Sequence, residues 1–374
     1  MRNKKSKSDS RKSSMPEEII YAIFSTLPVN SLMRFKCLSK FYNSLVSNPS
    51  FVDIHHGLSI SHLDNMKFLA RSTDGNFSYT IDQKAEQEKS IVILIDELDG
   101  IRYRRFDYVN GLFCLWSTKD HPPAIYNPTT RRIRYLPCLN SVDDGFTCYS
   151  YLFGFEPDIK KYKILMSSTL LRMNSPIKQW VLTLGSSESW REIKSAPCSL
   201  SLLTVGGVCI EGVTYFLGTH GDKRCIVEFN FKTENFRIIS LWNNIIEVPA
   251  ERFYSLIQVN GKLAVVGHSR RNVNEIRLRI LQSCETEEWV KHTVVLSEAL
   301  CSSLTTHFLG CFYGSTPDGE IVFISNSKLK RNCIVLYDLK KKSWREIKIK
   351  ELAEGVEIIG IYNHVGSLLS CIYC

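Results

Sequence analysis

The spacing of apolar residues changes once along the chain. Between residues 15 and 54, apolar side chains recur every three or four positions, which is the period of amphipathic helices. From residue 66 onward, apolar and polar residues alternate in short runs separated by turn residues, which is typical of β-strands. The pattern predicts a small helical segment in front of a large all-β domain.

The helical segment is predicted to hold two helices and a last short turn. Pro16 suits the start of the first helix, and Leu27-Pro28 ends it, because proline pushes the preceding residue out of the helical conformation. Asn30 or Ser31 can cap the second helix, and Asn48-Pro49 opens the final turn. The apolar positions of the second helix are Leu32, Phe35, Leu38, Phe41, Tyr42 and Leu45.

A helix pair of this length cannot bury its own apolar residues. One solution is that the apolar face packs on the β-domain of the same chain. The other is that it binds a groove on a partner helical protein, as amphipathic segments do. A handful of buried apolar side chains, at roughly 1.5–3 kcal/mol each, would hold such a complex against an association cost of at least about 4 kcal/mol.

Several short motifs follow one another at fixed spacing in this segment. They are Met15-Pro16-Glu17-Glu18-Ile19-Ile20, Ile23-Phe24, Leu27-Pro28, Ser31-Leu32, Arg34-Phe35-Lys36-Cys37, Ser39-Lys40 and Pro49-Ser50-Phe51. Together they resemble an F-box, which usually begins with leucine-proline and has valine and tryptophan where this chain has Leu38 and Tyr42. Met15 is a third departure, and each replacement keeps an apolar or aromatic side chain.

The resemblance to the F-box implies a partner. Such a module binds a Skp-family adaptor, which links it to a cullin–RING ubiquitin ligase. Lys40 would supply an orienting charge, and the other candidate residues would be buried anchors. The residues expected to bind the adaptor are Pro16, Ile20, Ile23, Leu27, Pro28, Leu32, Phe35, Leu38, Lys40 and Tyr42.

The β-domain is built on a repeat. The hexapeptide SWREIK occurs at residues 189–194 and again at 343–348. Four longer stretches share one plan, which is a strand, a polar turn, and then an aromatic residue followed by a basic one. These stretches are residues 180–194, 225–239, 276–292 and 333–348. Before and between them lie hairpins with the tight-turn signals Asn110-Gly111, Asn260-Gly261 and Asp318-Gly319.

The spacing of these hairpins predicts an architecture. The turns of these intervening hairpins recur every ~47–58 residues, which is within the range for a four-stranded propeller blade. Two hairpins in each period fit that count of strands. The sequence therefore predicts a β-propeller of six blades, in which strands near residues 66–95 close against a last strand at Ser367–Tyr373.

A second resemblance is clearest over residues 105–240. The motifs that carry it are Asn110-Gly111-Leu112, Tyr126-Asn127-Pro128-Thr129-Thr130-Arg131, Phe153-Gly154-Phe155-Glu156-Pro157, Tyr162-Lys163, Val208-Cys209-Ile210-Glu211-Gly212, Tyr215 and Phe229-Asn230. They are similar to the plant F-box-associated domain, which often has aspartate in place of Glu156 and Asn230. The resemblance implies that this domain holds a substrate, expected here to be a protein that the motifs do not identify.

The distribution of charge indicates a basic tail, and the cysteine content indicates the cellular compartment. The chain has 374 residues and a formal net charge of +9, and residues 1–14 hold six Lys or Arg against Asp9, which is +5 of the total. This tail has no apolar anchor and is expected to be disordered, with nuclear localisation or RNA binding as alternative roles. Thirteen scattered cysteines without a secretory signal favour the nucleus or the cytoplasm.

No motif in the sequence indicates catalysis. The nine histidines form no His-x-x-x-His pair, and His55-His56 points two side chains in different directions. A nucleophile elbow, a glycine-rich phosphate loop and a transmembrane stretch are all absent from the sequence. We therefore expect a soluble protein that is not an enzyme, with no cofactor, no metal, no membrane contact and no nucleic-acid partner.

The predicted organisation is a disordered basic tail at 1–14, an F-box at 15–56 and an F-box-associated propeller-like domain at 57–374. The predicted function is the substrate-recognition subunit of an SCF-type ubiquitin ligase. Its F-box docks the adaptor, and its propeller recruits a protein target for ubiquitination. Four rival hypotheses remain: an interaction protein without a degradative role, a glycan-binding propeller, a propeller enzyme with a metal in its central channel, and an RNA-binding protein that uses the basic tail.

Overall fold

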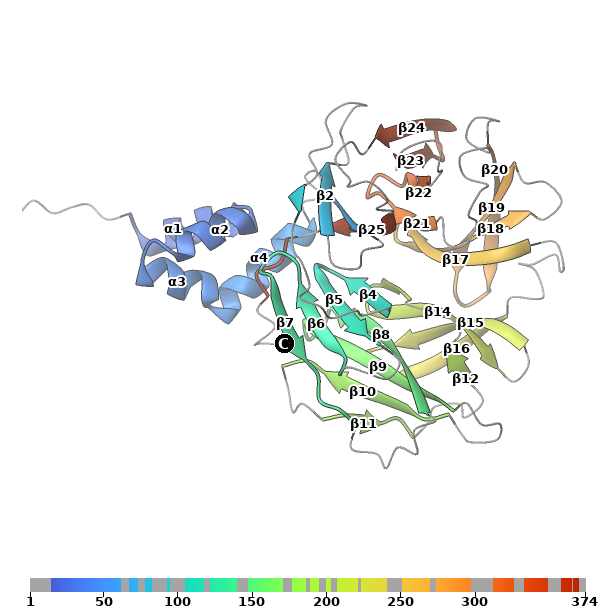
Figure 1. The fold of residues 1–374 in the computed structure, drawn as a ribbon, viewed down its shortest axis with the longest axis horizontal. Coiled ribbons are helices and arrows are strands. Elements are labelled where there is room, and N and C mark those ends of the chain that lie inside the picture. Colours follow the sequence, from blue (N-terminus) through green and yellow to red (C-terminus); the bar gives the residue numbers. More distant parts are fainter. Residues whose placement is uncertain are drawn as a thin grey trace, which may run out of the picture.

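The structure is a computed structural model in which four helices project from one side of a body built of strands (Figure 1). The basic tail predicted at 1–14 lies outside the described residues. The structure describes residues 15–61, 67–72, 78–82, 93–94, 105–117, 122–139, 147–170, 177–185, 189–194, 200–202, 207–220, 223–240, 251–269, 274–296, 312–325, 333–348, 358–364 and 366–369.

Residues 15–61, called the head below, form four helices. The helices are α1 (Glu17–Thr26), α2 (Val29–Lys36), α3 (Lys40–Ser47) and α4 (Pro49–Ser61). The first helix starts after Pro16 and ends before Leu27, which confirms the prediction for this segment. The second helix starts directly after Pro28 with no side-chain cap, so the predicted cap at Asn30 or Ser31 is wrong.

Two further predictions for the head are also wrong. The single second helix is split into α2 and α3 because Ser39 is extended, and its side chain accepts a hydrogen bond from the Tyr42 N–H that caps α3. The predicted final turn is the 13-residue helix α4. Its first turn is held by Asn48, whose Oδ1 accepts a hydrogen bond from the Phe51 N–H at 3.2 Å.

The described strands form six antiparallel sheets. One contains β4 (Arg105–Val109), β5 (Leu112–Trp116), β6 (Ala124–Asn127) and β7 (Arg132–Tyr135). The next contains β8 (Thr147–Glu156), β9 (Lys161–Leu170), β10 (Gln179–Thr183) and β11 (Arg191–Glu192). A third contains β12 (Leu200–Leu202), β13 (Val208–Ile210), β14 (Val213–His220), β15 (Lys223–Asn230) and β16 (Asn235–Ser240).

The remaining sheets follow the same plan. The fourth contains β17 (Glu251–Val259), β18 (Lys262–Ser269), β19 (Glu275–Ser283) and β20 (Glu288–Val295), and the fifth contains β21 (Phe312–Ser315), β22 (Ile321–Ser325), β23 (Cys333–Asp338) and β24 (Ser343–Lys348). The sixth joins β1 (Lys67–Ser72), β2 (Ser78–Asp82), β3 (Ile93–Leu94) and β25 (Ile358–His364). This confirms the predicted propeller, and its six sheets agree with six blades.

The sheet that contains β1 is built from both ends of the propeller. Strand β25 pairs with β1, as expected for strands near 66–95 and the last strand of the domain. The predicted closing strand Ser367–Tyr373 is nevertheless wrong, because β25 ends before it and residues 366–369 are not in a strand. The carbonyl groups of Ser367 and Leu369 accept hydrogen bonds from the Asn127 side chain. Residues 370–373 lie outside the described residues.

One turn design accounts for the repeated polar stretches. In four sheets, the turn between the last two strands begins with a residue whose side-chain oxygen accepts hydrogen bonds from one or two backbone N–H groups two or three residues later. The residue four positions after it has a left-handed backbone. The accepting side chains are Asn127, Asn230, Ser283 and Asp338, and the left-handed residues are Arg131, Glu234, Glu287 and Lys342. Asparagine, aspartate and serine suit this position because their short side chains reach their own backbone.

A glycine allows two neighbouring sheets to come close. A Cβ at Gly154 in β8 would overlap the aromatic ring of Phe231, which is fully buried at the end of β15. The same contact face holds the buried side chains Leu152 and Phe229. The motif around Gly154 therefore serves packing between blades.

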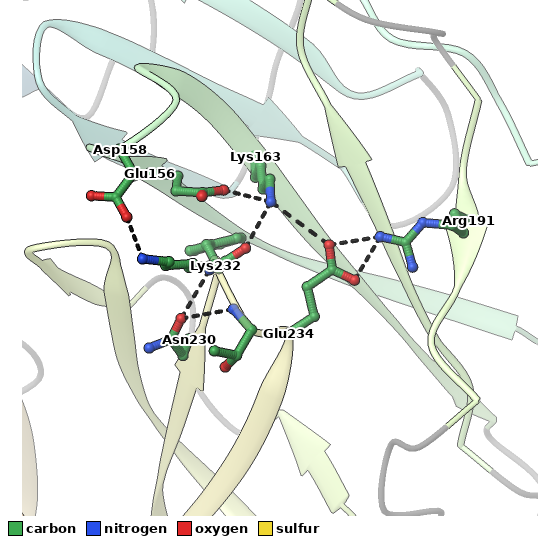
Figure 2. Close-up of polar contacts among 9 residues, drawn as sticks. Glu156, Asp158, Lys163, Arg191, Asn230, Lys232 and Glu234 are labelled. Atoms are coloured by element: carbon green, nitrogen blue, oxygen red, sulfur yellow. Dashed lines mark hydrogen bonds and ion pairs between the residues drawn. The ribbon is translucent and has the colours of Figure 1, made fainter.

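Charged side chains join the same two sheets (Figure 2). The Lys163 Nζ lies 2.6 Å from Glu156 Oε2 and donates a hydrogen bond to the Phe231 carbonyl at 2.7 Å. The Lys163 and Glu156 side chains are 9% and 6% exposed, so this ion pair is buried. Glu234 lies 3.7 Å from the same ammonium group and accepts two hydrogen bonds of 2.6 Å from Arg191. The network fixes the β15–β16 turn to the neighbouring sheet.

A buried carboxyl group joins three sheets. Asp107 in β4 accepts hydrogen bonds from its neighbour Tyr108, from Phe153 in β8 and from Gly207 beside β13. Burial raises the pKa of Asp107 to about 7, and the three N–H donors act against this rise. Because its hydrogen bonds go to the propeller backbone, Asp107 has a structural role.

Candidate adaptor-binding surface

The four helices share a small core. Its fully or nearly buried residues are Phe24, Val29, Leu32, Val46, Phe51 and Val52. The Phe24 ring stacks on Tyr42 with centroids 5.1 Å apart, and it lies 4.9 Å from the Phe35 ring. These contacts hold α1 against α2 and α3, so the head presents a defined outer surface.

The outer surface of the head is unusually apolar. Six large apolar side chains there are between 41% and 69% exposed, namely Met15, Ile19, Ile23, Leu38, Phe41 and Ile54. In the described part of the propeller only four side chains have comparable exposure, and these are Tyr135, Ile159, Val290 and Val295. Exposed apolar side chains concentrated on one small module indicate a protein-binding surface.

The ten residues predicted to bind the adaptor fall into three groups. Leu32 is fully buried in the core of the head. The half-buried residues are Ile20, Leu27, Phe35 and Tyr42, and the exposed ones are Pro16, Ile23, Pro28, Leu38 and Lys40. Their binding role stays a prediction, and only the half-buried and exposed residues offer surface to a partner in this structure.

Sequence reasoning did not include four of the exposed apolar residues among the candidates. They are Met15, Ile19, Phe41 and Ile54. The spacing held a signal for two of them, because Met15, Ile19 and Ile23 are four residues apart and so lie on one side of α1 and its entry. We add these residues to the candidate surface.

The head is attached to the propeller through α4. The Nε2 of His56 lies 3.2 Å from the Tyr162 hydroxyl, which donates a hydrogen bond to the Asn110 carbonyl at 2.8 Å. The His56 ring also lies 5.9 Å from the Phe155 ring. Burial, and to a smaller extent the neighbouring His55, lower the pKa of His56 to about 4. We call this contact the α4 joint.

The α4 joint is expected to make stability depend on pH. The pKa of His56 is about 4 in the folded chain, whereas an unperturbed histidine, as in the unfolded chain, has a pKa of 6.5. Between pH 4 and 6.5 the unfolded chain therefore binds more protons than the folded chain. Neutral His56 therefore contributes about 3 kcal/mol to the free energy of unfolding above pH 6.5, and this contribution is lost as the pH falls toward 4. Denaturant unfolding at several pH values measures the combined slope, to which His364 contributes in the same direction as His56, and Asp107, whose pKa is raised, contributes in the opposite direction.

A His56→Gln variant isolates the contribution of the α4 joint. It should flatten part of the slope between pH 6.5 and 4, and the same change at the exposed His292 serves as the matched control. Equal slopes in the His56→Gln variant and the unchanged chain would contradict the assignment.

Within the described ranges, no three His, Cys, Asp or Glu side chains come together in a group that could hold a metal ion. Among the helices that the structure describes, none is long and apolar enough to cross a membrane.

Comparisons with known proteins match both parts of the chain. The F-box domain matches residues 13–53, and the F-box associated beta propeller domain matches residues 64–367. A relative in Arabidopsis thaliana, itself named for its F-box, is 27% identical and aligns with 95% of this chain and 90% of its own length. A second Arabidopsis thaliana F-box protein is 28% identical over 95% of this chain and 91% of its own.

A helical F-box in front of a propeller defines a class of protein, the F-box substrate-recognition proteins. The chain belongs to the plant F-box proteins with an F-box associated beta propeller domain, since that domain matches more than half of its length.

Proposed function

We propose that the chain is the substrate receptor of an SCF-type ubiquitin ligase. The head docks a Skp-type adaptor, which connects it to a cullin–RING scaffold, and the propeller binds a protein target. The observation that carries this proposal is the set of exposed apolar side chains on the head. Free in solution, these side chains are in contact with water, so covering them with a partner is favourable.

The receptor has no catalytic role of its own in this proposal. It holds the target near the ubiquitin-charged enzyme, and the gain in rate comes from proximity. The buried charged groups fit a structural role, because Lys163 and Glu156 neutralise each other and the hydrogen bonds of Asp107 go to backbone groups. We expect no bound cofactor.

A binding experiment with purified adaptor tests the proposal. The Ile23→Asp/Leu38→Asp variant places two charges on the exposed surface of the head, and it should lower adaptor affinity at least about 100-fold because each charge must lose its water on binding. The matched control is Ile159→Asp, which changes a propeller residue of similar exposure and should bind as the unchanged chain does.

Circular dichroism and thermal unfolding must show that the variants remain folded. Equal adaptor affinity in the double variant and the unchanged chain would contradict the proposed surface. Absence of binding by every folded chain would contradict the proposed function.

We further propose that the chain works in the nucleus or the cytoplasm. The net charge of +5 in residues 1–14 supports a nuclear component. A fluorescent fusion is expected to be present in the nucleus and to shift toward the cytoplasm when residues 1–14 are removed. Retention of an unchanged distribution would contradict a role for the tail.

A further inference from the structure

Residues 366–369, which follow the last strand, pack against the head. Leu368 is 6% exposed, and it packs among the core residues of the head, which include Val29, Leu32 and Phe51. The next residue, Leu369, packs against both the head core and the core between the β4–β7 and β8–β11 sheets. Residues 366–369 therefore contact both parts of the molecule.

A turn of the propeller anchors this segment. The Nδ2 of Asn127 donates hydrogen bonds to the carbonyl of Ser367 at 3.0 Å and to the carbonyl of Leu369 at 2.8 Å. Asn127 and Ser367 are both fully buried. The backbone N–H of Ser367 also donates to Thr129 Oγ1 at 3.3 Å in the same turn. The segment is thus held on the two sides of Leu368.

Asn127 serves two purposes in its turn. Its Oδ1 accepts the turn hydrogen bonds, as the oxygens of Asn230, Ser283 and Asp338 do in the other sheets. Its amide nitrogen is then available for the segment that carries Leu368. Serine and aspartate have no amide nitrogen, so an asparagine is required in this sheet if the segment is to be anchored.

We propose that residues 366–369 form a clasp that fixes the orientation of the head on the propeller. The α4 joint holds the head at α4, and the clasp holds it at the helical core. Two separate contacts restrain a rotation of the head on the propeller that a single contact would allow. This inference rests on the proposed function for its purpose, because a receptor must place the target at a defined distance from the adaptor. Asn127 and Leu368 would be positioning residues, since they touch neither partner.

Distance measurements between the two parts test the clasp. Spin labels carried by unnatural amino acids at the exposed positions Asn43 in α3 and Lys341 in the β23–β24 turn report the head–propeller distance in the full chain. The unchanged chain should give one narrow distance distribution. The Leu368→Ala variant should broaden it and should speed amide exchange in the head by at least about tenfold, because a buried leucine is lost from the head core.

An asparagine pair provides the matched control. The Asn127→Asp change keeps the oxygen that accepts the turn hydrogen bonds but replaces the donor to the clasp, so the distribution should broaden. The Asn230→Asp change makes the same substitution in an equivalent turn of another sheet and should leave the distribution narrow. Thermal unfolding checks that the propeller is folded in each variant.

The outcomes separate the clasp from the proposed function. Broad distributions in Leu368→Ala and Asn127→Asp, with a narrow one in Asn230→Asp, support the clasp. Equal widths in all chains, or a broad distribution in the unchanged chain, overturn it. A narrow distance in an unchanged chain that does not bind the adaptor leaves the clasp supported and overturns the proposed function.

Discussion

A chain in which Lys163 is replaced by alanine is expected to lose a large part of its stability. Lys163 is buried and pairs with Glu156 at 2.6 Å while it donates to the Phe231 carbonyl (Figure 2). Removal of the ammonium group leaves a buried carboxylate and a buried carbonyl without this partner. Breaking a buried ion pair in this way costs about 3–5 kcal/mol, which guanidinium unfolding would measure.

The control for this prediction lies in the same network. Lys232 pairs with Asp158 at 2.5 Å, but both side chains are more than half exposed, so Lys232→Ala should leave the free energy of unfolding nearly unchanged. A Lys163→Ala variant no less stable than Lys232→Ala would contradict the role assigned to the buried pair.

A second large effect is expected in the head. Leu32 is fully buried, and Leu32→Ala should destabilise the head by about 2–5 kcal/mol because the structure cannot fill the cavity completely. Leu38 is 69% exposed, so Leu38→Ala should leave stability nearly unchanged and weaken adaptor binding directly. Hydrogen exchange of the head and adaptor titration, run on both variants, separate the two effects.

The opposite result would change the interpretation of the head. If Leu32→Ala weakens binding without faster exchange in α1–α3, then Leu32 contacts the adaptor, and the head must open when it binds. If Leu38→Ala binds as tightly as the unchanged chain, the exposed side chains are not the docking surface.

The propeller could be predicted from the sequence because its determinants are local. Asn110 and Asn260 have a left-handed backbone in front of a glycine, so the tight turns that set the hairpins follow from adjacent residues. The same holds for Asn230 and Asp338, whose side chains cap their own turns. Regular recurrence of these turns was sufficient to indicate the number of blades.

Two outcomes that the apolar pattern leaves open depend on contacts between distant residues. The predicted last strand at Ser367–Tyr373 is wrong, and Leu368 instead completes the core of the head. Leu32 is fully buried in the head core, and its docking role stays a prediction, because a buried core position and an exposed anchor can have the same side chain. The apolar pattern alone does not reveal which surface covers a residue.

The break between α2 and α3 had a local signal that the sequence reasoning did not use. Ser39 precedes α3 and caps it, which is a common role of serine at a helix start. The apolar spacing continues across this break, because Phe35, Leu38 and Tyr42 remain three or four residues apart. The apolar periodicity therefore predicts one helix where the cap at Ser39 separates two.

The central claim is that the head docks a Skp-type adaptor through its exposed apolar surface. Isothermal titration of purified plant Skp-type adaptor into the full chain, at several temperatures, tests it most directly. We expect a one-to-one complex whose heat capacity of binding is negative, as burial of apolar surface requires. A folded chain that binds no adaptor at any temperature, or that binds it without a negative heat capacity change, would contradict the claim.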